Sequence, residues 1–308
     1  MEIVNQTLIK YFILVGFSQN FLSCILQFIF FFIMYMLIIL GNGFLIFTVI
    51  FSPKLHTPMY YFLCNLSFLD LCCTSCSVPR LLVDIFSKTR RISLIGCITQ
   101  MIFSLLLGGT ESILLVVMAY DRYIAICLPL YYTVIMSWRV CRYITVALWV
   151  GSFIVCTVPV MARPLVFCKE NTLNHFACEV LALLEVACGD LSFYKITIVA
   201  VGVFTLFTPI VLIVVSYICI IFSILKIPSV QGRSKAFFTC SSHLIVVSMY
   251  FITCLTMYMG QSRGFAAKAK YYSLIYAVLT PAVNPLIYSL RNKEIKEAFC
   301  KVMSVGYK

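Results

Sequence analysis

Several apolar runs in this chain are each long enough to cross a lipid bilayer as a helix, and this feature constrains the fold most. The first runs from about Leu22 to Ile50 and contains no charged residue. About 20 consecutive apolar residues span the roughly 30 Å of hydrocarbon in a bilayer. The chain is 62% hydrophobic and only 11% charged, which is more apolar than a soluble core needs. The sequence therefore predicts an all-α membrane protein and excludes a soluble fold.

We expect seven spans, which together form a seven-transmembrane helix bundle. The six that follow the first are expected from the Thr57-Pro58 step to about Leu82, from about Cys97 to Arg122, from about Tyr143 to Met161, from about Ile196 to Leu225, up to about Met259, and from about Tyr271 to Leu290. The whole chain, 1–308, is then one domain, with an N-terminal segment 1–21, a helix bundle 22–290 and a tail 291–308. In the tail, apolar residues recur at helical spacing, which predicts a short amphipathic C-terminal helix on the membrane surface.

The formal charge of +12 does not indicate a nucleic-acid partner, because the basic residues are scattered over short connections. It also does not orient the chain, since twelve Lys and Arg lie on one side and eleven on the other. Asn5 begins an Asn-Gln-Thr glycosylation triplet, which is used only in the secretory lumen. We therefore expect a multi-pass plasma-membrane protein with its N-terminus extracellular.

Four cysteines are expected on the same extracellular side. Cys168, Cys178 and Cys188 share the longest loop, and Cys97 stands at the head of the third span. Four cysteines allow three pairings, and the spacing does not choose among them. Disulfides need an oxidising compartment, which agrees with the orientation from Asn5.

An acid and a base, Asp121 and Arg122, lie side by side where the third span ends. Charges at a membrane are costly unless they are paired or at the water boundary. The pair can act as a latch, in which the acid holds the guanidinium until a partner offers a better contact. An ion pair that only marks the membrane boundary is the alternative interpretation.

Two further acids, Asp70 and Glu111, are expected at membrane depth in neighbouring spans. Neither has a basic residue at a similar depth, so the two either share protons or hold a cation. Oxygen ligands favour a small hard cation such as sodium. In the seventh span, Pro285 predicts a kink, and the Asn284 side chain is expected to satisfy the freed backbone groups.

The chain resembles the olfactory receptors, a family of rhodopsin-like G-protein-coupled receptors. The resemblance runs from Asn5 to Asn292. It rests on five segments in order: Leu55 to Tyr60, Met118 to Cys127, Ser216-Tyr217, Lys235 to Leu244, and Pro281 to Asn292. Each segment is modest evidence alone, and the five together are specific.

The resemblance implies a receptor that binds a small volatile molecule and activates an olfactory-type Gs protein to raise cAMP. It assigns roles in activation to seven residues: Asp121, Arg122, Tyr123, Tyr217, Asn284, Pro285 and Tyr288. It implies a sodium ion at Asp70 and Glu111 and no other cofactor. It also implies disulfides from Cys97 to Cys178 and from Cys168 to Cys188, with Cys97 to Cys188 left open. The chain departs from the family pattern at Phe238, where serine is usual, and at Tyr250-Phe251-Ile252, where Phe-Tyr-Gly is usual.

Counting back from Arg122 in helical turns gives the residues of the third span that face the ligand pocket, and the fifth and sixth spans supply the opposite wall. The ten candidates are Ser104, Leu105, Gly108, Gly109, Ser112, Val201, Thr205, Phe251, Cys254 and Tyr258. None is charged, so we expect a neutral ligand. The two glycines are expected to leave room for it.

The main competing function is a transporter or ion channel with Asp70 and Glu111 in an ion path. That function predicts internal repeats, and none is visible. An enzyme is not expected, because the three histidines, His56, His175 and His243, fall in or near expected connecting segments and form no catalytic or metal cluster.

Overall fold

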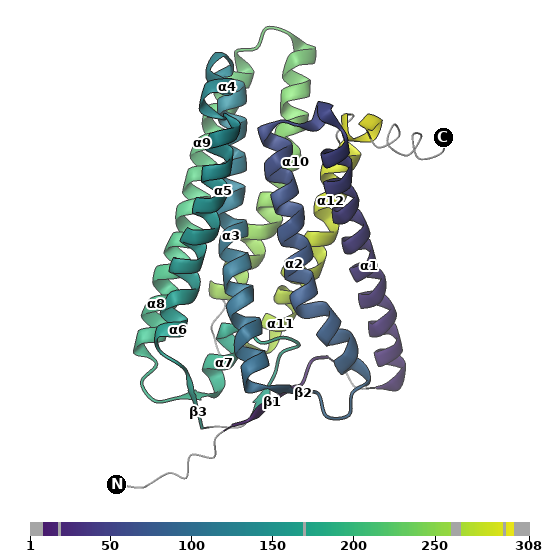
Figure 1. Ribbon diagram of the computed structural model, residues 1–308, viewed down its shortest axis with the longest axis vertical. Coiled ribbons are helices and arrows are strands. Elements are labelled where there is room, and N and C mark those ends of the chain that lie inside the picture. The colour runs from purple at the N-terminus through teal and green to yellow at the C-terminus, as the bar shows by residue number, and fades with distance from the viewer. Residues whose placement is uncertain (1–8, 18–19, 169–170, 260–265, 292–293, 299–308) are drawn as a thin grey trace.

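Long helices run side by side between the two ends of the molecule in the computed structural model, which describes residues 9–17, 20–168, 171–259, 266–291 and 294–298 (Figure 1). These helices form seven rods, numbered in chain order. The first three are α1 Phe21–Phe51, α2 Pro58–Phe86 and α3 Leu94–Cys127, and the fourth consists of α5 Trp138–Ser152, η3 Phe153–Thr157 and α6 Val158–Ala162. The fifth consists of α8 Ser192–Gly202, η4 Val203–Phe207 and α9 Thr208–Leu225, the sixth is α10 Val230–Met259, and the seventh consists of α11 Ala266–Leu274, η5 Ile275–Leu279 and α12 Thr280–Arg291. Short helices η1 Pro53–Leu55, η2 Pro129–Tyr131, α4 Tyr132–Ile135 and α7 Val180–Val186 lie in the connections. The described part of the chain is therefore a bundle of seven helical rods, as the apolar runs predict.

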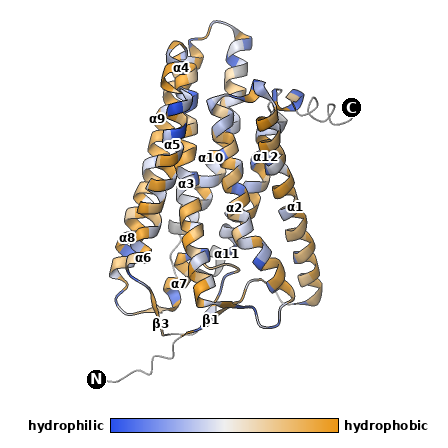
Figure 2. Ribbon diagram, viewed as in Figure 1, coloured by the Kyte–Doolittle hydropathy of each residue, from blue (hydrophilic) through white to orange (hydrophobic). Residues whose placement is uncertain are grey.

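Six of these rods are long and apolar enough to cross a membrane. Their outward faces carry large apolar side chains, among them Phe21 at 78% exposure and Ile196 at 70%. Figure 2 shows hydrophobic residues along most of the length of the outer helices. Such a surface on a soluble protein would aggregate, whereas hydrocarbon solvates it. The chain is a multi-pass membrane protein.

The helices extend beyond the predicted spans mainly where their ends are polar. The second helix continues past Leu82 to Phe86, and the fourth begins at Trp138 rather than near Tyr143. The extra turns contain Asp84, Arg139 and Arg142, which lower the hydropathy but do not prevent helix formation.

Three of the rods contain a π-helical segment that ends two residues before a proline. The prolines are Pro159 after η3, Pro209 after η4 and Pro281 after η5. A proline has no N–H, and its ring crowds the carbonyl four residues earlier, so the helix widens there. The Thr205 carbonyl, freed in this way by Pro209, accepts a hydrogen bond from the Ser112 hydroxyl of α3.

In the seventh rod, side chains from α1 and α2 satisfy the freed carbonyls. The Thr74 hydroxyl donates to the Ala277 carbonyl at 3.2 Å. The Asn42 amide donates to the Pro281 carbonyl, which Pro285 frees, at 3.0 Å. The expectation that Asn284 would do this was wrong, because the Asn284 amide donates to Asp70 instead. These bonds fix α1 and α2 against the kinked rod.

One end of the bundle carries short strands that the sequence analysis did not predict. β1 Tyr11–Leu14 lies between β2 Arg91–Ser93, which is antiparallel to it, and β4 Thr172–Leu173, which is parallel. A separate pair, β3 Val166–Phe167 and β5 Ala187–Cys188, is antiparallel. We name this the sheet end. The opposite end, which contains α4 and the end of α12, is the Arg122 end (Figure 1).

The predicted amphipathic helix is described only at residues 294–298, which are helical. Ile295 and Ala298 are buried against the bundle core, and the Tyr60 hydroxyl donates to Glu294 at 2.7 Å. The apolar face of this segment therefore packs on protein rather than only on lipid.

Candidate functional site

An internal cavity of about 90 Å³ lies among α3, the fourth, fifth, sixth and seventh rods and α7. Seven of the ten candidate pocket residues line it: Ser104, Leu105, Gly108, Gly109, Val201, Thr205 and Cys254. Eight residues that were not predicted also line it: Met101, Cys156, Glu179, Val180, Leu181, Tyr250, Met257 and Tyr276. The cavity is small, since a water molecule in the liquid occupies about 30 Å³.

Two of the other three candidates, Ser112 and Phe251, do not line this cavity. Ser112 is fully buried, and its hydroxyl is used by the Thr205 carbonyl. Phe251 is 4% exposed and packs in the main core, edge-on to Tyr250. The side chain of Tyr258 is outside the described residues, as is the whole of Asn5. Helical counting gave the correct face of α3, but it did not give the depth at which the cavity ends.

The expectation that two glycines leave room for the ligand needs correction. A Cβ added to Gly109 would lie 2.5 Å from the Cys156 sulfur, so Gly109 is where η3 packs closely on α3. A Cβ on Gly108 would lie 3.0 Å from the Tyr276 hydroxyl. Neighbouring side chains already occupy the space beside both glycines.

Two tyrosines close the floor of the cavity. The Tyr250 hydroxyl donates to the Gly108 carbonyl at 2.7 Å, and the Tyr276 ring lies edge-on to Tyr250 with centroids 5.7 Å apart. At the position where the family pattern has tyrosine, this chain has Phe251, which carries no hydroxyl. Instead, Tyr250 supplies one from the preceding position, so the shifted tyrosine was itself the signal that sequence reasoning missed.

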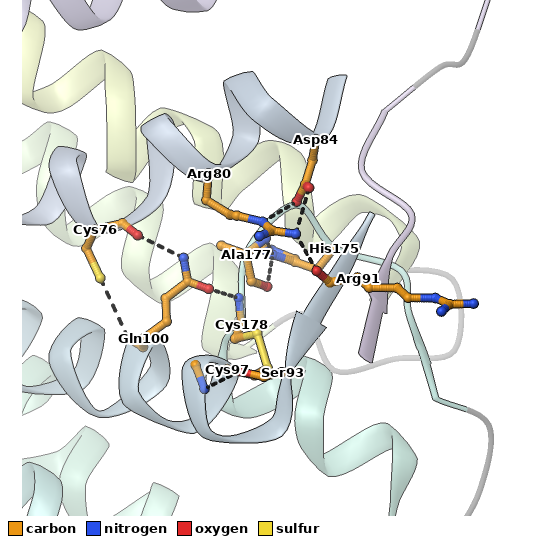
Figure 3. Close-up of a disulfide and its surroundings, with 11 residues drawn as sticks. Cys76, Arg80, Asp84, Arg91, Ser93, Cys97, Gln100, His175, Ala177 and Cys178 are labelled. Carbon is orange, nitrogen blue, oxygen red and sulfur yellow. Dashed lines mark hydrogen bonds and ion pairs between the residues drawn. A yellow bond between two sulfur atoms is a disulfide. The ribbon is translucent and has the colours of Figure 1, made fainter. Parts of the chain in front are cut away.

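Two disulfides hold the loop that covers the cavity. They join Cys97 to Cys178, with Cα atoms 5.3 Å apart, and Cys168 to Cys188. This is the pairing that the resemblance implies. Figure 3 shows the first, beside which the Cys178 N–H donates to the Gln100 side chain at 2.8 Å. Gln100 also donates to the Cys76 carbonyl at 2.9 Å, so α2, α3 and the loop are tied together.

Glu179 follows Cys178 directly and brings a carboxylate to the cavity wall. The Ser273 hydroxyl donates to its Oε2 at 3.0 Å, and the buried His175 Nε2 lies 3.7 Å from the same oxygen. Helical counting along the spans could not predict this acid, because it lies in a loop. The signal that could have placed it was its position one residue after a cysteine tied to the head of α3.

The two acids predicted at membrane depth are both buried, Asp70 at 0% and Glu111 at 2% exposure. Asp70 accepts two bonds from the Asn284 amide, at 3.0 and 3.2 Å. The Tyr276 hydroxyl and the Asp70 carboxylate both lie close enough to Glu111 to interact with it electrostatically. The Asn284 Oδ1 atom is buried without a hydrogen-bond partner among the described residues. This set of hard oxygen atoms, one of them unsatisfied, fits a small cation.

At the Arg122 end, Asp121 has a different partner from the one predicted. The Tyr132 hydroxyl of α4 donates to Asp121 at 2.9 Å. Among the described residues, the ion pairs do not include one between Asp121 and Arg122. Burial and the nearby carboxylate raise the pKa of Tyr132, so its hydroxyl remains a donor at neutral pH. The acid is therefore hydrogen-bonded by the following connection, and Arg122 acts on it electrostatically without a close ion pair.

The other predicted activation residues gather around Arg122. Tyr217 bonds to His243 Nδ1 over 2.8 Å, and both lie within electrostatic reach of the guanidinium. The Tyr288 hydroxyl is buried in the same region without a hydrogen-bond partner among the described residues. The placement of His243 in or near a connecting segment was wrong, because it is 1% exposed inside α10. Tyr123 is half-buried on the last turn of α3.

Comparison with known proteins agrees with this arrangement. The profile of a family described as "Olfactory receptor" matches residues 31–305. Olfactory receptor 13C9 of Homo sapiens is 48% identical over 309 residues, covering 97% of this chain and 96% of that protein. Olfactory receptor 13C2 of Homo sapiens is 47% identical with the same coverage, and olfactory receptor 2A7 of Mus musculus is 42% identical over 97% of both chains. The chain belongs to the olfactory receptor family.

Proposed function

We propose that this protein is an odorant receptor that binds a small molecule in the cavity and activates a heterotrimeric G protein of the olfactory Gs type at its Arg122 end, raising cAMP. The observation that carries the proposal is the cavity itself. It is enclosed by helices that continue to the Arg122 end. A ligand that moves these helices therefore also moves the polar cluster of Arg122, Tyr217 and His243 at that end.

The orientation supports the same proposal. The sheet end carries the two disulfides, which require an oxidising compartment and so favour the extracellular side. The Arg122 end then faces the cytoplasm, where a G protein is available. The relatives are named as receptors, which favours this function over a transporter or channel.

The cavity wall is mostly apolar, which favours a small and largely hydrophobic ligand that carries no net charge. Burying each CH₂ group of such a ligand contributes about 0.8 kcal/mol. Burying an anion there, beside the Glu179 carboxylate, would instead cost several kcal/mol of desolvation.

The test uses cells that express the full chain with a cAMP reporter and a panel of volatile compounds. Arg122→Ala is expected to abolish the cAMP response while the receptor remains at the cell surface. Arg139→Ala is the matched control, since Arg139 is exposed at the same end on α5 and its loss should leave the response intact. A normal response from a well-expressed Arg122→Ala variant contradicts the proposal.

Sodium is the one cofactor we propose, held by Asp70 and Glu111 with Asn284 nearby. The purified receptor is expected to have a higher melting temperature in sodium chloride than in potassium chloride of equal ionic strength. Asp70→Asn should remove that difference. Equal melting temperatures of the unmodified receptor in the two salts rule out the site.

A further inference from the structure

We propose that the Glu179 carboxylate selects ligands that carry a hydrogen-bond donor, so that alcohols bind in preference to aldehydes and ethers of the same size. The inference deepens the proposed function, because it names the chemistry of the ligand that the cavity takes.

Glu179 is held in place by the covalent framework of the loop. Its neighbour Cys178 is bonded to Cys97 of α3, and the Cys178 N–H donates to Gln100 (Figure 3). Glu179 is also the residue immediately before α7, whose first two residues, Val180 and Leu181, line the same cavity. The carboxylate is thus positioned by a disulfide and a short helix rather than by a free loop.

Only one of the two carboxylate oxygens is engaged. Oε2 accepts the Ser273 hydroxyl at 3.0 Å and lies 3.7 Å from His175 Nε2. Within the described residues, Oε1 has no hydrogen-bond donor. The side chain is 22% exposed, and it lies within electrostatic reach of the Cys254 thiol on the opposite wall. A carboxylate oxygen is therefore available to a molecule in the cavity.

Several other polar groups of the cavity already have hydrogen-bond partners. Tyr250 donates to the Gly108 carbonyl at 2.7 Å and Thr205 donates to the Val201 carbonyl at 2.8 Å, and the Tyr276 hydroxyl lies 3.7 Å from the Cys73 sulfur. The cavity wall therefore offers a ligand mainly hydrogen-bond acceptors. A ligand with an O–H satisfies Glu179, whereas an aldehyde or ether brings a second acceptor to a site that lacks donors.

The test measures binding to the purified full-length receptor by ligand-induced thermal stabilisation. The probes are linear alcohols of four to eight carbons, each with the aldehyde and the methyl ether of equal heavy-atom number. We expect the best alcohol to reach half-maximal stabilisation at a concentration about tenfold lower than its aldehyde and ether, the factor typical of one hydrogen bond to a charged group.

Glu179→Gln is expected to reduce this preference to about twofold or less, because an amide presents a donor as well as an acceptor. Glu179→Asp keeps a carboxylate and should retain the preference at lower affinity. Glu185→Gln is the matched control, since Glu185 is an exposed residue of α7 that does not line the cavity, and the preference should be unchanged.

The inference is wrong if no alcohol stabilises the receptor, if aldehydes or ethers do so equally well, or if Glu179→Gln keeps the preference. The wild-type series alone decides the question if the Gln variant does not fold. A parallel cAMP assay separates the two proposals. A receptor that binds alcohols selectively but raises no cAMP contradicts the proposed function and leaves the role of Glu179 standing.

Discussion

At the scale of single residues, the cavity depends on side chains that reach across between helices. Tyr250 is one of these, because its hydroxyl joins α10 to the backbone of α3 beneath the cavity. Its neighbour Phe251 turns into the core instead. Of these two adjacent aromatic residues of α10, only Tyr250 lines the cavity.

Tyr250→Phe is expected to lower the thermal stability of the purified receptor, because the Gly108 carbonyl loses its bond from α10. Interhelical hydrogen bonds in membrane proteins contribute about 0.6 kcal/mol on average. Tyr143→Phe is the control, since Tyr143 is 69% exposed on α5 and should give no change. Equal stabilities for the two variants would show that the Tyr250 bond contributes nothing measurable.

Gly109 makes a second prediction at this scale, because α3 and η3 approach each other closely there. Gly109→Ala places a methyl group 2.5 Å from the Cys156 sulfur and should reduce both folding yield and thermal stability. Adding Cys156→Ala removes the sulfur and should restore much of the loss. Gly151→Ala is the control, since nothing lies within 4 Å of its added Cβ. If the double variant is no better than Gly109→Ala, the contact is not the cause.

At the scale of helices, the kinked seventh rod is held by the α1 and α2 side chains that bind its freed carbonyls. Gly41 contributes as well, because its added Cβ would lie 3.1 Å from Pro285. The Gly-Asn-Gly sequence at 41–43 therefore places a small residue against the proline and an amide against the carbonyl that the proline frees. This explains the close approach of α1 and α12.

Asn42→Ala should destabilise the receptor by an amount on the order of 1 kcal/mol, because the Pro281 carbonyl is left without a donor. In a Pro285→Ala background, residue 285 regains an N–H that can bond the same carbonyl, so Asn42→Ala should then cost much less. The measurement is a double-mutant cycle on melting temperature. Additive effects of the two substitutions would contradict the pairing.

The sequence was sufficient for the helices but not for the details that shape the cavity. Hydropathy located the spans, because a bilayer demands long apolar runs. It could not place the π-helical segments or the strands β1, β2 and β4, which are too short for an alternating pattern to be distinct. Glu179 was missed for a related reason, since its contact with the cavity depends on how a loop folds back rather than on helical spacing.

At the scale of the whole molecule, the two ends differ in chemistry. The sheet end has two disulfides and a three-stranded sheet, whereas the Arg122 end has the polar cluster of Arg122, Tyr217 and His243. Because basic residues are nearly balanced between the two sides, these features decide the proposed orientation more than charge does.

That orientation predicts that Asn5 is glycosylated. The receptor from mammalian cells should shift to lower mass on a gel after glycosidase treatment, and Asn5→Gln should have the lower mass without treatment. Asn65→Gln is the control, because Asn65 lies inside α2 and should not change the mass. If antibodies reach an N-terminal epitope tag only after the cells are permeabilised, the proposed orientation is wrong.

The place of β1 between β2 and β4 also has a consequence for biosynthesis. β1 leaves the ribosome first, yet Ile13 pairs with Thr172, which is translated only after four spans have been made. Until then β1 can pair only with β2, and the backbone N–H and C=O groups on its other edge are available to other strands or to chaperones. The three-stranded sheet can therefore close only after the first four helical rods and the loop that contains β4 have been made.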